Sequence, residues 1–112
     1  MKKYIVLYHA SGSAMKKMQE IGPEEMKKGM EPWMIWAKKC GRNLVNLGAP
    51  LGGGIKLSKT GSEPSKKNVV GYSILQAENI ETAKKLLKNH PHLEWTDGCE
   101  IEVHEAQPLP NQ

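Results

Sequence analysis

The sequence contains no phenylalanine and only two cysteines, Cys40 and Cys99, among its 112 residues. Without Phe, much of the bulk of a core must come from Trp33, Trp36 and Trp95, with help from the tyrosines and methionines. Two widely separated cysteines argue against a disulfide scaffold or a cysteine-based zinc module. The remaining balance, 38% apolar and 25% charged residues, is typical of one globular domain.

Long apolar runs are also missing from the chain. No window approaches the roughly 18 apolar residues that a membrane-spanning helix requires. The N-terminal run from Tyr4 to Tyr8 is shorter than the core of about 7 to 15 residues in a secretory signal. The sequence therefore predicts a cytoplasmic protein without membrane association.

Arginine is scarce, because the basic residues are fifteen lysines and a single arginine, with a net charge of +4. Arginine forks read base edges and exposed aromatic platforms hold single strands, and neither pattern occurs here. We predict no nucleic-acid partner. The segment His90-Pro91-His92 lacks the ligand spacing of a zinc site, and we expect no metal and no cofactor.

We expect residues 1–106 to form a single domain and residues 107–112 to form a loose C-terminal tail. The segments 3–9 and 68–77 are apolar on both alternating sides, which predicts strands that are covered on both faces. Two further strands and two helices follow from alternation, caps and a helical stripe. Strands are expected at 3–9, at 43–47 with an irregular continuation to 55–57, at 68–77 and at 99–106, helices at 24–40 and 80–89, and a polar loop at 58–67.

Pro32 lies inside the first of these helices, where proline costs about 3 kcal/mol. The sequence leaves two alternatives, a kinked helix or two helical segments with Pro32 opening the second.

The order β-α-β-β-α-β predicts an α+β, ferredoxin-like plait. Two right-handed crossovers give a four-stranded antiparallel sheet of order 4-1-3-2, with both helices on one face. The other face would leave the apolar sides of the two middle strands bare, beyond what a soluble monomer usually exposes. We therefore expect a homodimer in which two sheets meet face to face and form a dimeric α/β barrel.

Several short stretches of the sequence resemble the YCII-related family, and within it the DGPF-type branch. The similarity covers most of residues 3–106 and consists of PEEM at 23–26 with Met30 and Trp33, Leu44-Val45 with Gly48 and Leu51, GYSIL at 71–75 with Ala83, and IEV at 101–103. The resemblance implies a dimeric α/β barrel, for most members without an established activity. Some members resemble muconolactone-processing dehalogenases that use a His-Asp pair. This chain departs from the family in having Ser65-Lys66-Lys67-Asn68 in place of the Asp-Gly-Pro-Phe segment and no histidine between Ala10 and Asn89.

The predicted topology gathers polar residues at one rim of the sheet. His9 ends the first strand next to the start of the last strand, and the connector ending at Asp97 reaches the same edge. One interpretation makes His9 and Asp97 an acid–base pair, and the other makes them a strand end and a turn. In the first interpretation the ligand-binding residues are Ser11, Trp36, Trp95 and His92.

Glu102 and His104 alternate with Ile101 and Val103 on the last strand, so they lie on one side of it. If Ile101 and Val103 face the helices, this acid–imidazole pair faces the expected partner subunit. We favour a role at the dimer interface over a catalytic role.

Two functions remain open on the sequence alone. The first is binding of a small organic acid in a cleft beside the sheet, with possible isomerase-like or lyase-like acid–base activity. The second is a non-catalytic dimeric interaction or regulatory module, in which lysine-rich outer helices contact a partner. No motif in the sequence identifies a substrate.

Overall fold

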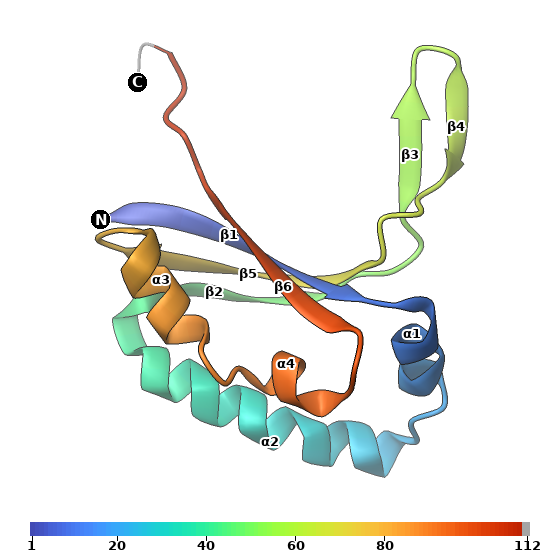
Figure 1. Cartoon of the computed structure of the whole chain (residues 1–112), viewed down its shortest axis with the longest axis horizontal. Helices are drawn as coiled ribbons and strands as arrows, with labels where there is room; N and C mark the ends of the chain where they lie inside the picture. Colours follow the sequence, from blue (N-terminus) through green and yellow to red (C-terminus); the bar gives the residue numbers. More distant parts are fainter. Residues whose placement is uncertain (111–112) are drawn as a thin grey trace.

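The main sheet forms one layer of the molecule and the helices form the other, as the computed structural model shows for residues 1–110 (Figure 1). The last two residues of the expected C-terminal tail lie outside this description. The elements are β1 (Lys2–Ala10), α1 (Gly12–Gln19), α2 (Pro23–Cys40), a 3-10 turn (Gly41–Asn43), β2 (Leu44–Pro50), β3 (Ile55–Ser58), β4 (Gly61–Pro64), β5 (Val69–Ala77), α3 (Ile80–Leu87), α4 (Pro91–Trp95) and β6 (Cys99–Glu105).

The expected α+β class and the four-stranded antiparallel sheet are confirmed. The sheet has the order β2-β5-β1-β6, and all three pairings are antiparallel. This differs from the expected 4-1-3-2 in its numbering, because β3 and β4 are two strands that the sequence did not predict separately. Helices α2, α3 and α4 lie on one side of the sheet (Figure 1).

The two faces of the central strands have different surroundings. On β1, Tyr4, Val6 and Tyr8 point toward the helices and are buried, whereas Ile5 and Leu7 on the other face are half-buried. The same alternation runs along β5. The face that carries Ile5 and Leu7 is called the open face below, because no helix covers it (Figure 1).

Helix α2 begins where the sequence predicts and runs without interruption through Pro32. Pro23 occupies the first turn, Glu24 and Glu25 lie at the positive end of the helix dipole, and Lys38 and Lys39 lie at the negative end. The alternative of two separate helical segments is therefore wrong. The buried side chains of α2, Trp36 and Cys40, belong to the core together with Tyr4, Val6 and Leu75.

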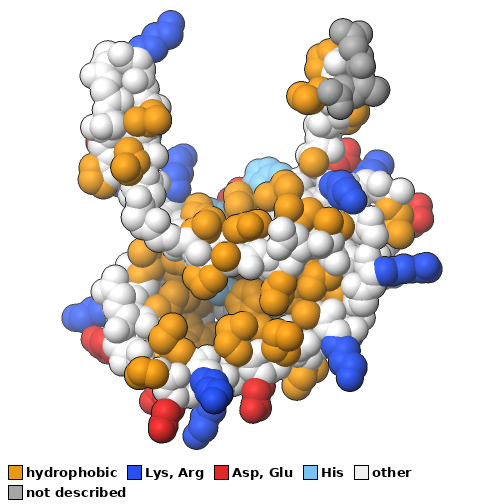
Figure 2. Space-filling model, turned by 180° about the vertical axis from the view of Figure 1, so that it is seen from behind, with side chains coloured by type: hydrophobic (Ala, Val, Ile, Leu, Met, Phe, Trp, Pro, Cys, Tyr) orange, Lys and Arg blue, Asp and Glu red, His pale blue; other side chains and the backbone are white. Residues whose placement is uncertain are grey.

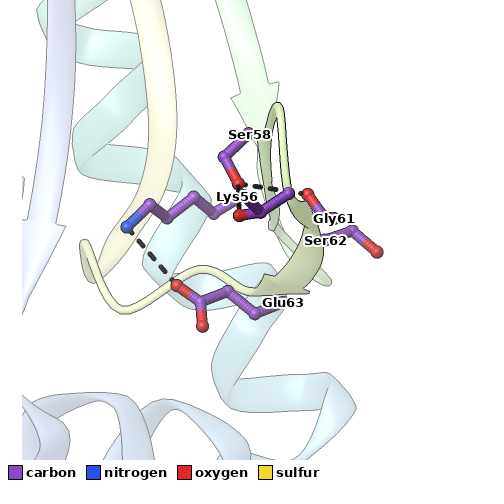
Figure 3. A pocket seen from close by; sticks show the side chains of 6 residues that line it. Lys56, Ser58, Gly61, Ser62 and Glu63 are labelled. Carbon is purple, nitrogen blue, oxygen red and sulfur yellow. Dashed lines mark hydrogen bonds and ion pairs between the residues drawn. The ribbon is translucent and has the colours of Figure 1, made fainter.

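Residues 55–64 form a separate β-hairpin, which corrects two expectations. Ile55–Leu57 does not continue the second strand, and the polar stretch 58–67 is not simply a loop, because β3 pairs with β4 from Ile55↔Pro64 to Ser58↔Gly61. Lys56 and Glu63 form an ion pair of 3.4 Å across the hairpin, and the Ser58 hydroxyl donates a hydrogen bond to the carbonyl of Gly61 (Figure 3). The hairpin projects from the sheet on the side opposite the helices (Figure 1).

The departure of the hairpin begins at Gly48, in an irregular part of β2. Gly48 has a φ of 83°, and a Cβ atom there would lie 1.7 Å from the carbonyl oxygen of Tyr72. Only glycine permits this close approach of β2 to β5. Pairing of β2 ends at Pro50, and the glycines that follow carry the chain away from the sheet.

Candidate functional site

His9, Glu102 and His104 form a cluster on the open face of the sheet. The imidazole Nε2 of His9 lies 3.7 Å from a carboxylate oxygen of Glu102, whose other oxygen accepts a hydrogen bond of 2.5 Å from Nε2 of His104. The local cause is strand pairing, because β6 lies beside β1 with Glu102 opposite Leu7 and His104 opposite Ile5. Glu102 thus bridges two histidines from adjacent strands.

The hydrogen bonds of this cluster define its protons. Nδ1 of His9 lies 3.2 Å from the backbone carbonyl of Lys67, so Nδ1 must carry a proton and donate it. In neutral His9 the lone pair of Nε2 then faces the Glu102 carboxylate. A proton on Nε2 turns this contact into an ion pair.

The charge of Glu102 is stabilised by its neighbours. The hydrogen bond from His104 is the main reason that the pKa of Glu102 lies below its usual value, with further lowering by the charges of His9, His104 and Lys67. Partial burial acts in the opposite direction. At neutral pH Glu102 is therefore a carboxylate, and its negative charge lies beside both imidazoles.

His9 and Asp97, the expected catalytic pair, are not joined in the structure. Asp97 is exposed, and the hydrogen bonds and ion pairs of residues 1–110 contain no contact between it and His9. The carboxylate beside His9 belongs to Glu102 instead. The sequence placed His9 at the end of the first strand and Glu102 on the last strand, but it did not pair them, because the pairing depends on the β1–β6 register.

Ser11 and Trp95 lie near the expected rim of the sheet. The Ser11 hydroxyl accepts a hydrogen bond of 3.2 Å from the backbone N–H of Ala14 and thereby caps α1. Trp95 ends α4 and is 41% exposed. Ser11 has a structural role in this arrangement, whereas the indole of Trp95 is open to a ligand.

Trp36 and His92, the other expected ligand-binding residues, are both buried in the core. The Trp36 indole donates a hydrogen bond of 2.8 Å to the carbonyl of Leu86, and its ring lies 4.4 Å from that of His90. Nε2 of His92 bonds to the backbone carbonyl of His9 at 2.8 Å. Contact of either side chain with a ligand would require the core to open.

A buried chain of hydrogen bonds crosses the helix-side core, and sequence reasoning missed it. Nδ1 of His90 accepts the backbone N–H of His92 at 2.9 Å, so its Nε2 carries the proton and faces the Tyr8 hydroxyl at 3.3 Å. The Tyr8 hydroxyl lies 2.7 Å from that of Ser73, which donates to the carbonyl of Leu47 at 2.6 Å. A serine in the middle of an apolar strand was the one sequence signal for it.

Burial keeps this chain of groups neutral. It lowers the pKa of His90 to about 3 and raises the pKa of Tyr8 to about 12, in the latter case against the opposing effect of the hydrogen bond between Tyr8 and Ser73. Every member has a hydrogen-bond partner, which is the requirement for burying polar groups at low cost. The chain therefore stabilises the core and is not poised for proton exchange at neutral pH.

The surroundings of the open face contain unusually exposed apolar side chains. The hairpin and the C-terminal segment both project from this side of the molecule (Figures 1 and 2). Ile55, Leu57 and Leu109 on these projections are 68%, 78% and 65% exposed. Figure 2 also shows apolar side chains gathered around a hollow in the middle of the face seen there, below the two projections. Large exposed apolar side chains of this kind are common at contact surfaces between molecules.

A second hollow, of about 330 Å³, lies on the hairpin and is lined by polar side chains (Figure 3). Its groups are occupied with one another, since Lys56 pairs with Glu63 and Ser58 bonds to Thr60 and Gly61. It offers no converging set of free polar groups to a ligand.

Within residues 1–110, no three His, Cys, Asp or Glu side chains are placed to hold a metal ion. None of the helices described for this chain has the length and hydropathy to cross a membrane. No protein-family model matches the chain, and the comparison with curated proteins finds no match.

Proposed function

We propose that this protein is a homodimer, formed through the open face, that binds a small organic acid beside His9 and Glu102 and exchanges a proton with it. The observation that carries the proposal is the His9–Glu102–His104 cluster on an apolar, uncovered sheet face. The dimeric α/β barrel implied by the resemblance to the YCII-related family agrees with it.

The apolar part of the open face supports the dimer. Ile5 and Leu7 of β1 lie opposite Ile74 and Tyr72 of β5, so four large side chains form a continuous patch across the two middle strands. All four are only half-buried in the single chain. Covering them with the same patch of a second copy removes more apolar surface from water, at roughly 25 cal/mol per Å².

The polar part of the open face supports the chemistry. Nε2 of His9 is buried without a hydrogen-bond partner among the described residues and lies 3.7 Å from the Glu102 carboxylate, while Nδ1 is bonded to the Lys67 carbonyl. A histidine beside a carboxylate can act as a proton donor or acceptor toward a small acid. An acid–base group beside an apolar surface fits proton transfer on a small organic acid.

The dimer is tested by sedimentation equilibrium of Leu7→Lys and of a matched control, Ile35→Lys. Ile35 is 69% exposed on α2, on the helix side of the molecule, so its substitution leaves the open face intact. We expect the mass of two chains for the wild type and the control, and of one chain for Leu7→Lys with an unchanged circular dichroism spectrum. A wild type with the mass of one chain at about 0.1 mM would refute the dimer, since stable interfaces bind more tightly than this.

The ligand site is tested by a thermal-shift screen of small mono- and dicarboxylates with wild type, His9→Ala and Lys16→Ala. Lys16 is an exposed residue of α1 and lies outside the cluster. We expect stabilisation of the wild type and the Lys16 variant by at least one acid, and none of His9→Ala. Equal stabilisation of all three proteins would reject His9 as the binding group.

A further inference from the structure

A groove with an apolar floor lies on the helix side of the molecule, between α3, α4 and β6. Its volume is about 450 Å³. The floor consists of Leu87, Leu93, Ile101 and Val103, which come from these three elements. Leu93 is 42% exposed, so the floor is open to a ligand without any rearrangement of the core.

This groove is separate from the His9–Glu102–His104 cluster. Ile101 and Val103 alternate with Glu102 and His104 along β6, and successive residues of a strand point to opposite faces. The groove therefore opens on the helix-covered face and the cluster on the open face. Dimerisation through the open face leaves the groove accessible.

The rim of the groove on α3 is positively charged. It contains Lys84, Lys85 and Lys88, with Glu81 as the acidic member. Glu81 pairs with Lys84 at 3.5 Å. The ion pairs formed among residues 1–110 include neither Lys85 nor Lys88, so these two ammonium groups have no carboxylate partner in the described part of the chain.

We propose that this groove binds an aliphatic carboxylate, with the hydrocarbon chain over Leu93, Ile101 and Val103 and the carboxylate at Lys85 and Lys88. The groove has the size usual for a small-molecule site. Its charge complements an anion, and its floor complements a hydrocarbon. A cationic amphiphile would be repelled by the positive charge of the lysines. A short polar acid would leave the apolar floor of the groove exposed to water.

Isothermal titration calorimetry with decanoate, below its micelle concentration, tests the proposal on wild type, on Lys85→Gln/Lys88→Gln and on Lys38→Gln/Lys39→Gln. Lys38 and Lys39 are exposed lysines at the end of α2, outside the groove, and provide the matched control for charge. We expect binding by wild type and control, and a loss of about tenfold or more in the groove variant, since two ion pairs disappear. Equal affinity of all three proteins overturns the proposal.

The floor is tested separately with Leu93→Ser, because Leu93 is exposed and lies outside the buried core. We expect decanoate affinity to fall about fivefold, with the wild-type circular dichroism spectrum retained. In the wild type, decanoate should shift the backbone amide resonances of Leu93, Ile101 and Val103. Shifts confined to the open face, or unchanged affinity of Leu93→Ser, overturn the placement of the ligand.

Three further ligands determine which chemistry is recognised. Decanol and decyltrimethylammonium have the same chain without the carboxylate, and we expect each to bind at least about tenfold more weakly than decanoate. Vesicles of phosphatidylglycerol present anionic groups on a bilayer. Equal binding of all three amphiphiles, binding of vesicles without decanoate, or no binding of decanoate at millimolar concentration would each overturn the proposal.

Discussion

The two faces of the main sheet are built from the same strands but differ in how far their side chains are buried. On the helix side, Tyr4, Val6 and Leu75 are fully buried. On the open face their neighbours Ile5 and Ile74 are equally apolar but only half-buried. The polar groups divide in the same way, because the helix side encloses a neutral hydrogen-bond chain and the open face carries charged Glu102. The difference teaches that the cover over a strand, and not its residue types, decides whether a side chain acts as core.

The largest contrast is expected between Leu75→Ala and Ile74→Ala, adjacent residues of β5. Leu75 is 0% exposed, so its truncation should lower the free energy of unfolding by about 3 kcal/mol through lost burial and a cavity. Ile74→Ala should lower it by less than about 1 kcal/mol in a dilute solution of single chains. Urea denaturation measures both values. Equal losses would show that the two faces contribute equally to the stability of the single chain.

The next contrast compares Tyr8→Phe with Tyr72→Phe, on the helix side and the open face. Removing the Tyr8 hydroxyl leaves the Nε2–H of His90 buried without its acceptor, which should cost about 1–3 kcal/mol. The Tyr72 side chain is half-buried on the open face, and its variant should be near neutral. Thermal and urea denaturation of both variants provide the measurement. A neutral Tyr8→Phe would remove the hydrogen-bond chain as a source of stability.

The helix-side histidines should make the protein sensitive to acid. The folded-state pKa of His90 is lowered to about 3, so between pH 6.5 and this value the unfolded chain binds a proton that the folded chain does not. The free energy of unfolding should therefore fall as pH falls, approaching about 1.4 kcal/mol per pH unit for this single group. Burial lowers the pKa of His92 as well, which acts in the same direction.

Urea denaturation of wild type, His90→Gln and His104→Asn between pH 5 and 6.5 measures this slope. His90→Gln should flatten it, and His104→Asn, an exposed variant of the open face, should leave most of it unchanged. Identical slopes for wild type and His90→Gln would mean that His90 is already protonated in the folded chain or remains neutral in both states.

The smallest effect concerns the charged cluster on the open face. The pKa of Glu102 is lowered first by its hydrogen bond from His104 and last by the charge of Lys67. His104→Asn should therefore raise the pKa of Glu102 more than Lys67→Gln does. Carboxyl carbon shifts followed by NMR over pH 2 to 7 measure both changes. The reverse order would mean that long-range charge, and not the hydrogen bond, holds Glu102 ionised.

The sequence predicted the main sheet well and the candidate site only in part. Alternation placed the four strands, and Pro23 and Asn79 indicated where α2 and α3 begin. Glu102 and His104 were correctly placed on one side of their strand, because the two-residue period is local. The pairing of His9 with Glu102 was not predicted, since it depends on the register between strands that are about ninety residues apart.

The hairpin and the buried histidines show why the rest could not be predicted. A polar stretch rich in Ser and Lys has the composition of a loop, and β3 and β4 form because each supplies the other's backbone partners. His90 and His92 follow a helix and flank a proline, a pattern that is compatible with exposed positions. They are buried because Tyr8 of β1 and Trp36 of α2 close over them.

The sequence by itself determined the four strands of the main sheet, the helices α2 and α3 and the two-sided apolar character of β1 and β5, because each depends on residues within a few positions of one another. Tertiary structure alone decided which apolar face the helices cover, which carboxylate stands beside His9, and where lysines of α3 meet the apolar side of β6. These arrangements arise from contacts between distant segments, whose geometry no local periodicity encodes.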